Sequence, residues 1–282
     1  MEIVPDCNKK RMNLLPGNSC IILRGLPSGT KEEMLYNNIM IMGDMFMPTK
    51  EWMEKYELKK DDLCCKVDLD AYFTEKKIQD EDLDILDIGT VHFPTGTILA
   101  CDPLTELGEA RPFLQTVPAG TYPASICVCI RSERYACVKV AITDHKPVRY
   151  DMGVVGNEDL DENLEEDEYF GFSVDAGMGG ILDIKTQEEF NKYWAQREAE
   201  EEDIDVYNDL FYDLLEENSK VNPKYQQEEG DWVNWEIPET DCNILIFTAG
   251  WGDGVYPTYF GFDNEGKICS IYIWLIDLAK ES

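Results

Sequence analysis

The stretch that decides the fold is YPTYFGFDNEGKICSIYIWLI, residues 256–276. It holds two runs of aromatic and β-branched residues, 256–262 and 267–276, on either side of Asp-Asn-Glu-Gly at 263–266. Runs of this composition are typical of β-strands, and the glycine can take the positive φ that a four-residue hairpin loop needs. Residues 256–276 therefore predict an antiparallel hairpin.

More strands are predicted upstream of this hairpin. Residues 243–248 form a third apolar run near the C-terminal end of the chain. The runs on either side of the polar residues 131–134 predict a second hairpin, and residues 88–100 predict a third that turns at 94–96.

One long helical signal lies between these groups of strands. Apolar residues recur at helical spacing from about residue 186 to residue 218, and Thr186-Gln-Glu-Glu189 has the pattern of a capping box. The acidic run 198–203 interrupts the spacing, so one helix and two helices with a break near residue 200 both stay open. The fold class is α+β, a largely antiparallel sheet with this long or broken helix packed on it.

Residues 1–60 have a weaker pattern and are interpreted as a small N-terminal extension, which leaves residues 61–282 as the main domain. The early residues lack the continuous apolar run of a signal peptide, and no stretch has the length of a transmembrane helix. We therefore expect a cytoplasmic protein. Its ten cysteines, which include no C-x-x-C pair, are expected to be reduced and mostly buried.

The net charge excludes two classes of partner. The 282 residues include 25 Lys and Arg against 57 Asp and Glu, a formal net charge of −32. Such a surface repels nucleic acids and anionic membranes, which basic faces bind. The hydrophobic fraction of 44% is too high for a disordered acidic tail, so the charge must coat a packed core.

Three segments with Asp beside Gly or Pro are the candidate sites: residues 101–104, residues 174–180, which lead to Asp183, and residues 250–254. Glycines let a backbone approach a ligand closely, and carboxylates coordinate hard cations or hold hydroxyl groups. The alternative is that these segments are tight turns, with Asp102 capping its own turn through an Asx hydrogen bond. The candidate ligand-binding residues are Asp102, Asp175, Asp183, Gly252, Asp253, Gly254, Tyr256 and Tyr259.

Four motifs follow one another along the chain. They are GTILACDPL at 96–104, VPAGTYP at 117–123, VDAG at 174–177, and GWGDGVYP at 250–257 followed by YFGFDNEG at 259–266. Their order and spacing resemble the bacterial domain-of-unknown-function 4241 family, and the resemblance covers about residues 65–280. It implies a bacterial-type cytosolic protein in which Asp-Pro-Leu and Gly-Asp-Gly are family signatures, and it implies no activity or ligand.

Two functions fit these observations. The first is a non-enzymatic, immunity- or inhibitor-like binding protein whose acidic surface captures a basic protein partner. The second is a divalent-cation-dependent hydrolase or small-ligand-binding enzyme, in which clustered carboxylates hold Mg²⁺, Mn²⁺ or Ca²⁺ beside an aromatic wall. The sequence favours the first, because it contains no recognisable nucleophile or general base. The metal ligands of the second would be Asp102, Asp175, Asp183 and Asp253.

Overall fold

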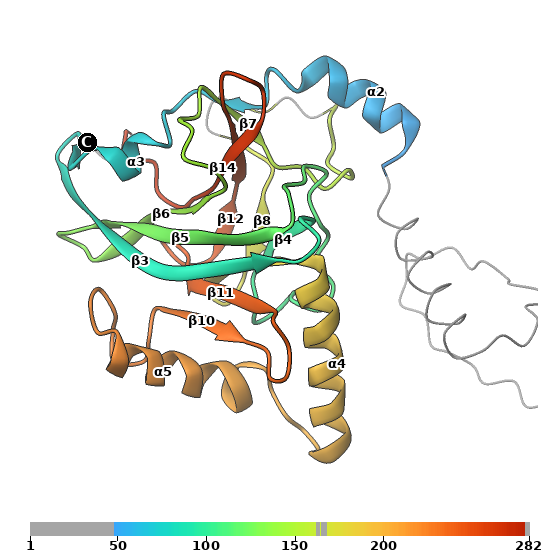
Figure 1. Ribbon diagram of the computed structural model, residues 1–282, viewed down its shortest axis with the longest axis vertical. Helices are drawn as coiled ribbons and strands as arrows, with labels where there is room; N and C mark the ends of the chain where they lie inside the picture. Colours follow the sequence, from blue (N-terminus) through green and yellow to red (C-terminus); the bar gives the residue numbers. More distant parts are fainter. Residues whose placement is uncertain (1–47, 162–163, 165–167, 280–282) are drawn as a thin grey trace, which may run out of the picture. The chain divides into compact units, whose positions relative to one another are not determined.

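The computed structural model of the protein describes residues 48–161, 164 and 168–279, which belong to the compact unit Phe46–Ser282. Antiparallel strands and a few helices give the predicted α+β fold (Figure 1). The helical elements are α2 (Lys50–Lys59), α3 (Ala71–Thr74), α4 (Ile184–Glu200), the π-helical turn η1 (Tyr207–Phe211) and α5 (Tyr212–Val221). The strands are β1 (Cys64–Cys65), β2 (Lys77–Ile78), β3 (Glu81–Phe93), β4 (Ile98–Cys101), β5 (Gly120–Cys129), β6 (Arg134–Ala141), β7 (Arg149–Met152), β8 (Phe172–Val174), β9 (Met178–Asp183), β10 (Trp232–Glu236), β11 (Asn243–Thr248), β12 (Gly254–Tyr256), β13 (Thr258–Phe262) and β14 (Ile268–Trp274).

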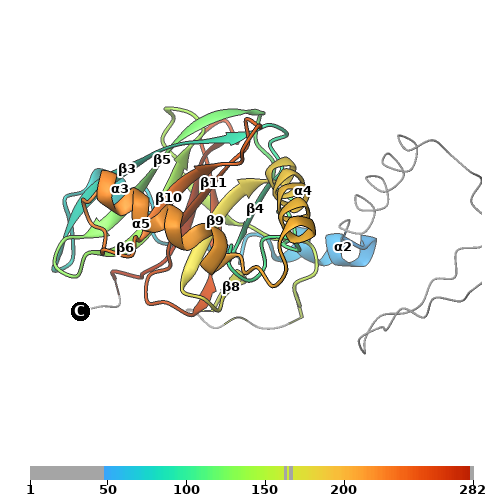
Figure 2. The same ribbon diagram turned by 90° about the horizontal axis from the view of Figure 1, so that it is seen from below.

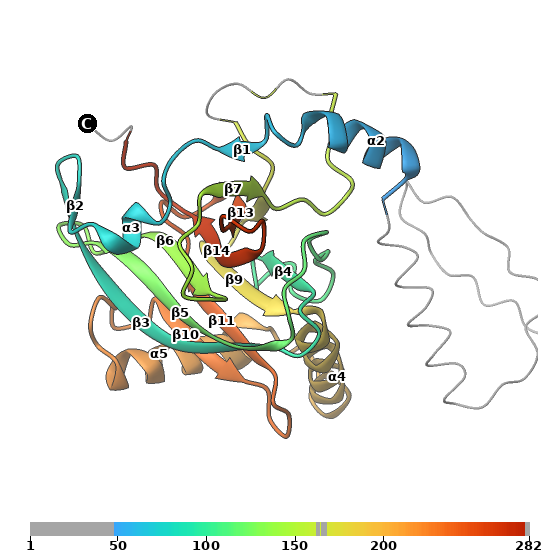
Figure 3. The same ribbon diagram turned by 45° about the horizontal axis from the view of Figure 1, so that its top comes forward.

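The two larger sheets and the helices α4 and α5 form three layers. An eight-stranded sheet, ordered β1-β7-β13-β14-β6-β5-β3-β2, packs on a four-stranded sheet ordered β10-β11-β9-β4, and β12 pairs with β8 in a small third sheet. The helices α4 and α5 cover the other face of the four-stranded sheet (Figures 2 and 3). The four-stranded sheet is therefore the middle layer.

Strand β11 shows why its residues form an uninterrupted apolar run. Leu245 and Phe247 belong to the core that joins the two sheets, whereas Ile244 and Ile246 belong to the core beneath the helices. Successive side chains of a strand point to opposite faces, so a strand in a middle layer needs apolar residues at every position. Burying each of these side chains stabilises the fold by roughly 1.5–3 kcal/mol.

The predicted C-terminal hairpin is confirmed as the pair β13–β14. Gly266 takes a φ of +73°, and the Asp263 amide donates to the carbonyl of Lys267 at 2.9 Å to close the turn. Pro257, however, splits the predicted first strand in two, because proline has no amide proton for a ladder. The piece before it, β12, leaves the large sheet and pairs with β8.

The hairpin predicted for residues 88–100 is wrong, whereas the one around residues 131–134 is confirmed as β5–β6. Strand β3 pairs with β5 in the large sheet, and β4 pairs with β9 in the middle sheet. The segment between them crosses from one sheet to the other. Its amides of Thr95 and Gly96 donate to the carboxylate of Asp183 instead of closing a turn.

The helical region is broken, the second of the two forms left open by the sequence: α4 ends at Glu200 and α5 begins at Tyr212 after η1. The capping box at residues 186–189 is wrong, because the N-cap of α4 lies three residues before Thr186. Asp183 is its N-cap, and Oδ1 of Asp183 accepts a hydrogen bond from the Lys185 amide at 2.8 Å.

Residues 1–47 of the predicted extension lie outside the described residues, and the boundary at residue 60 stays a prediction. Helix α2 is tied to the segment after β7, since Trp52 Nε1 donates to the Glu158 carbonyl at 2.9 Å. The predicted buried cysteines are confirmed for Cys127, Cys129 and Cys137, which are free thiols. Within the described ranges, no helix combines the length and apolarity needed to span a membrane.

Candidate functional site

Asp102 joins two of the predicted Asp-Gly segments from a buried position. Its Oδ1 accepts the Leu104 amide at 2.9 Å, which is the Asx hydrogen bond of a turn. Its Oδ2 accepts the amides of Asp175 and Ala176 at 3.0 and 2.7 Å. Both oxygens of this fully buried carboxylate therefore hold backbone.

Asp175 and Asp253 lie at the same place as Asp102. Gly254 pairs with Val174 in the antiparallel β8–β12 ladder, so the residues next to them, Asp253 and Asp175, are neighbours at the end of the two strands. Both side chains are exposed. Burial, followed by the charges of Asp175 and Asp102, raises the pKa of Glu106, a fourth acid that the sequence did not point to.

Asp183 is not part of this group. It lies at the other end of β9, where its two oxygens accept hydrogen bonds from Thr95, Gly96 and Lys185. The structure thus brings together three of the four predicted carboxylates. Across the described parts of the chain, no group of three or more His, Cys, Asp and Glu side chains is placed to hold a metal ion. The divalent-cation interpretation stays a prediction.

The 250–254 loop joins β11 to β12 and has a backbone that only glycine accommodates well. Gly250 has a φ of +35°, and a Cβ there would lie 2.6 Å from the carbonyl oxygen of Leu275. Gly252 has a φ of +99°. The hydroxyl of buried Tyr256 accepts the Trp251 amide at 3.3 Å and lies 2.8 Å from the Gly252 carbonyl oxygen. The loop is therefore held in one shape from inside.

Trp251 is presented to solvent by this loop. Its side chain is 58% exposed, and that of nearby Val255 is 47% exposed. The guanidinium of Arg134, the first residue of β6, lies 4.3 Å from the centroid of the Trp251 ring and donates to the Gly250 carbonyl at 2.8 Å. A large aromatic ring is thus fixed on the surface and not packed in the core.

Three acidic residues lie on or next to the segments that carry the loop and Arg134. Asp253 lies on the loop itself, and Glu133 precedes Arg134 in the β5–β6 turn. The carbonyl of Asp231 accepts the amide of Thr248 just before the loop. Burial raises the pKa of the Asp231 carboxyl, and the negative charge of Glu133 raises it further. Two like charges therefore lie close together here.

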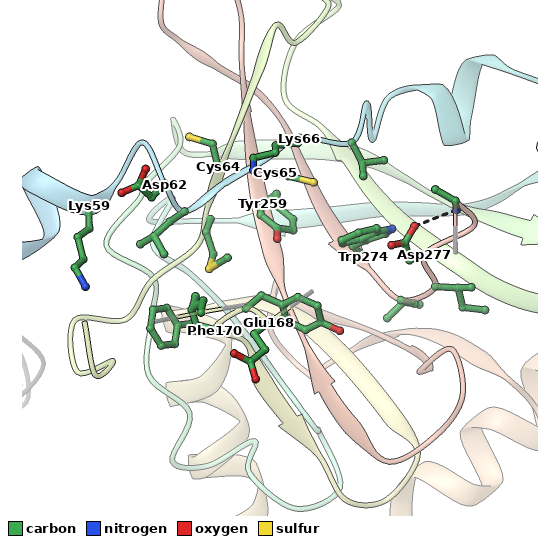
Figure 4. Close-up of a pocket in the computed structure, with 18 of the residues that line it drawn as sticks. Lys59, Asp62, Cys64, Cys65, Lys66, Glu168, Phe170, Tyr259, Trp274 and Asp277 are labelled. Atoms are coloured by element: carbon green, nitrogen blue, oxygen red, sulfur yellow. Dashed lines mark hydrogen bonds between the residues drawn. The ribbon is translucent and has the colours of Figure 1, made fainter. Parts of the chain in front are cut away.

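A pocket of about 950 Å³ is the second feature, and it contains the remaining predicted residue, Tyr259. The pocket lies where β1 passes the ends of β13 and β14 (Figure 4). Figure 4 shows Tyr259 facing Phe170 and Glu168 across it, with Trp274 and Asp277 at one end. Burial, with a smaller contribution from the charge of Asp277, raises the pKa of the lining Cys65 thiol to about 11, so this thiol is neutral at pH 7.

Three aromatic rings form the wall at that end of the pocket. The Trp274 centroid lies 6.4 Å from that of Tyr169 and 6.3 Å from that of Tyr259, with interplanar angles of 51° and 62°. Trp274 is anchored from behind, since its Nε1 donates to the hydroxyl of buried Tyr72 at 3.0 Å. The same hydroxyl accepts the amide of Leu278 at 3.1 Å.

Sequence reasoning found the 250–254 loop but missed Arg134 and most of the pocket wall. The Gly-Trp-Gly-Asp-Gly spacing was a usable signal for the loop. No sequence signal points to Arg134, because it lies in a polar run, predicted as a turn, more than a hundred residues from the loop. Tyr169 and Trp274 meet only through the fold.

Comparisons with known proteins find one family. A model described as Protein of unknown function (DUF4241) matches residues 91–273, more than half of the chain. This confirms the resemblance drawn from the four motifs, all of which lie inside the match. No curated protein and no solved structure matches the chain.

Proposed function

The chain belongs to the DUF4241 family, and from the geometry above we propose that it is a non-enzymatic binding protein that captures a basic protein partner at the 250–254 loop. Such capture is what an inhibitor or immunity protein does. The cytoplasm is the compartment that fits free thiols such as Cys127, Cys129 and Cys137. Nucleic acid is the partner that the charge disfavours most.

The charge that supports this proposal comes from the part of the chain that carries the loop. Residues 1–47 contain equal numbers of acidic and basic residues, so residues 48–282 account for the whole net charge of −32. A field of this size speeds encounter with a cationic protein and repels polyanions. The field acts at a distance and selects partners by the sign of their charge, but it does not by itself identify the residues that contact the partner.

Trp251 is the observation that carries the proposal. Tryptophan, tyrosine and arginine dominate the binding energy of protein interfaces, and they do so best where the free protein already holds them in place. Here Tyr256 fixes the loop beneath the exposed ring and Arg134 fixes it from the side. An aromatic anchor on a rigid loop costs little conformational entropy when a partner covers it.

The pair Glu133 and Asp231 indicates the sign of the partner's charge. Burial is the main cause of the raised pKa of Asp231, and the negative charge of Glu133 adds to it, so the two carboxylates repel each other in the free protein. A Lys or Arg of the partner placed between them removes that repulsion. We expect the pKa of Asp231 to fall in the complex.

Affinity capture from a native lysate, followed by direct binding of each purified candidate, tests the proposal. The wild type should retain a basic protein at low salt, and Trp251→Ala should lose it. Val221→Ala is the matched control, because Val221 is also an exposed apolar side chain, 72% exposed on α5. Equal retention by wild type and Trp251→Ala would overturn the role of the loop, and retention of only acidic proteins would overturn the choice of partner.

A further inference from the structure

We propose that the pocket walled by Tyr169, Tyr259 and Trp274 is a binding site for a small organic cation of the quaternary ammonium type. The site is separate from the 250–254 loop and does not depend on the partner proposed there. Its evidence is the arrangement of the rings, the carboxylates around them and the rigidity of the wall.

The rings have the arrangement that cation–π recognition uses. A cation is attracted to the face of an aromatic ring within about 6 Å of its centroid, and several rings set at angles surround it better than parallel ones. Tyr169 and Tyr259 both lie beside Trp274 with their planes inclined to it by 51° and 62°. Phe170 adds a fourth ring to the pocket lining.

The fixed charges of the pocket favour a cation. Its lining includes the carboxylates of Asp62, Glu168 and Asp277 against the ammonium groups of Lys59 and Lys66. Three carboxylates therefore face two ammonium groups, and the Nζ of Lys59 points to a neutral acceptor, the carbonyl of Leu160. Asp277 lies near the lining Cys65 thiol, since burial and then the charge of Asp277 raise the pKa of that thiol.

The central ring of the wall is fixed before a ligand binds. Trp274 is held by Tyr72, whose hydroxyl also binds the backbone of the segment that follows β14. A volume of about 950 Å³ exceeds what one ammonium group fills and lies at the upper end of small-molecule sites. The ligand is therefore a cationic group attached to a larger apolar body, and a simple ammonium compound should bind as its fragment.

Titration calorimetry with choline and with its neutral isostere, 3,3-dimethyl-1-butanol, tests the site. We expect choline to bind, and the isostere to bind at least about tenfold more weakly, as the loss of a desolvated cation–π contact implies. Tyr169→Leu, which removes a π face, should weaken choline binding by a similar factor. Tyr169→Phe keeps the face and should bind choline within about twofold of wild type.

Two lysine variants distinguish choline binding in the pocket from a general attraction of choline to an acidic protein. Lys66→Ala removes a like charge from the pocket and should tighten choline binding. Lys267→Ala removes the same charge on the distant β13–β14 turn, where the side chain is 71% exposed, and should change nothing. Absence of choline binding, equal binding of the neutral isostere, or equal effects of the two lysine variants would each overturn the site. The lysine pair gives this answer even if Tyr169→Leu does not fold.

Discussion

The guanidinium carbon of Arg134 lies 4.3 Å from the centroid of the Trp251 ring, and Nη1 of the same side chain donates to the carbonyl of Gly250. One cation thus holds both the side chain and the backbone of the surface loop. The stacking orients the ring, and the hydrogen bond fixes the glycine from which the loop turns. The loop is therefore held in one shape by contacts within the protein.

Replacing Arg134 by Met should loosen the loop without unfolding the protein. Methionine keeps an apolar stem over the ring but loses the charge and the hydrogen bond to Gly250. We expect faster amide exchange at Trp251 and Gly252 and a partner affinity about tenfold weaker, since rigidity is lost with one contact. Unchanged exchange rates in Arg134→Met would contradict the bracing role.

Asp102 should be irreplaceable for stability. Its two oxygens accept three backbone amides, and the amide nitrogen of an asparagine cannot accept a hydrogen bond. We expect both Asp102→Asn and Asp102→Ala to lower the free energy of unfolding by about 2–4 kcal/mol, because buried donors lose their acceptors. Denaturant unfolding measures this, with exposed Asp175→Asn as the control that should stay near wild type.

The same variant separates the anchoring role of Asp102 from the cation interpretation. If the carboxylate anchors backbone, EDTA leaves the unfolding midpoint of the wild type unchanged. A midpoint that falls with EDTA in the wild type but not in Asp102→Asn would show that a divalent cation is bound there.

Asp183 should stabilise both helix α4 and the crossing between the two sheets. It caps α4 and also accepts the amides of Thr95 and Gly96 at 3.0 and 2.9 Å, at the crossing between the two sheets. Asp183→Ala should cost about 3 kcal/mol, the sum of a lost N-cap and an unsatisfied buried donor. Asp183→Ser restores the cap alone and should recover about 1 kcal/mol of that loss. Equal stability of the Ala and Ser variants would contradict this division.

His145 and Asp263 should make stability depend on pH. Their side chains are 2.6 Å apart, and the hydrogen bond to Asp263 raises the pKa of His145 above its usual value. The hydrogen bond from His145, followed by that from the Lys267 amide, lowers the pKa of Asp263 to about 2. The stabilisation from the Asp263 carboxylate is complete above about pH 4 and is lost as the pH falls toward 2. The stabilisation from the His145 imidazolium is complete below about pH 6.5 and is lost as the pH rises through the raised pKa of His145.

Thermal unfolding of wild type and His145→Asn over this range tests that window. The wild type should have the higher midpoint between about pH 4 and 6.5, and the difference should shrink above about pH 7. A difference that is constant with pH would mean that His145 acts through packing and not through its charge.

The sequence reveals the parts of this fold that depend on local pattern. The hairpin at Asp263-Asn-Glu-Gly266 follows from turn chemistry, and the uninterrupted apolar run of β11 marks a strand covered on both faces. The partners of Asp183 could not be predicted, since Thr95 and Gly96 lie more than eighty residues earlier and look like a turn. The Pro94-Thr95-Gly96 signal is real locally, but sheet pairing overrides it.

The candidate site divides in the same way. Four carboxylates were expected together, and three of them, Asp102, Asp175 and Asp253, do lie together because three chain segments end at one edge. Asp183 lies at the other end of β9. What a carboxylate does there depends on which amides reach it, and no spacing in the sequence contains that information. The position of Arg134 over Trp251 likewise arises only when β6 and the 250–254 loop are brought side by side.

Binding kinetics of the purified partner, measured at several salt concentrations for wild type and Trp251→Ala, test the central claim most directly. If Trp251 is the anchor and the acidic surface guides encounter, Trp251→Ala should raise the dissociation rate about 30-fold, the equivalent of a 2 kcal/mol hot spot, and leave the association rate within about threefold. Salt should slow association in both proteins alike. A dissociation rate unchanged by Trp251→Ala, or an association rate that is independent of salt, would contradict capture of a basic protein at this loop.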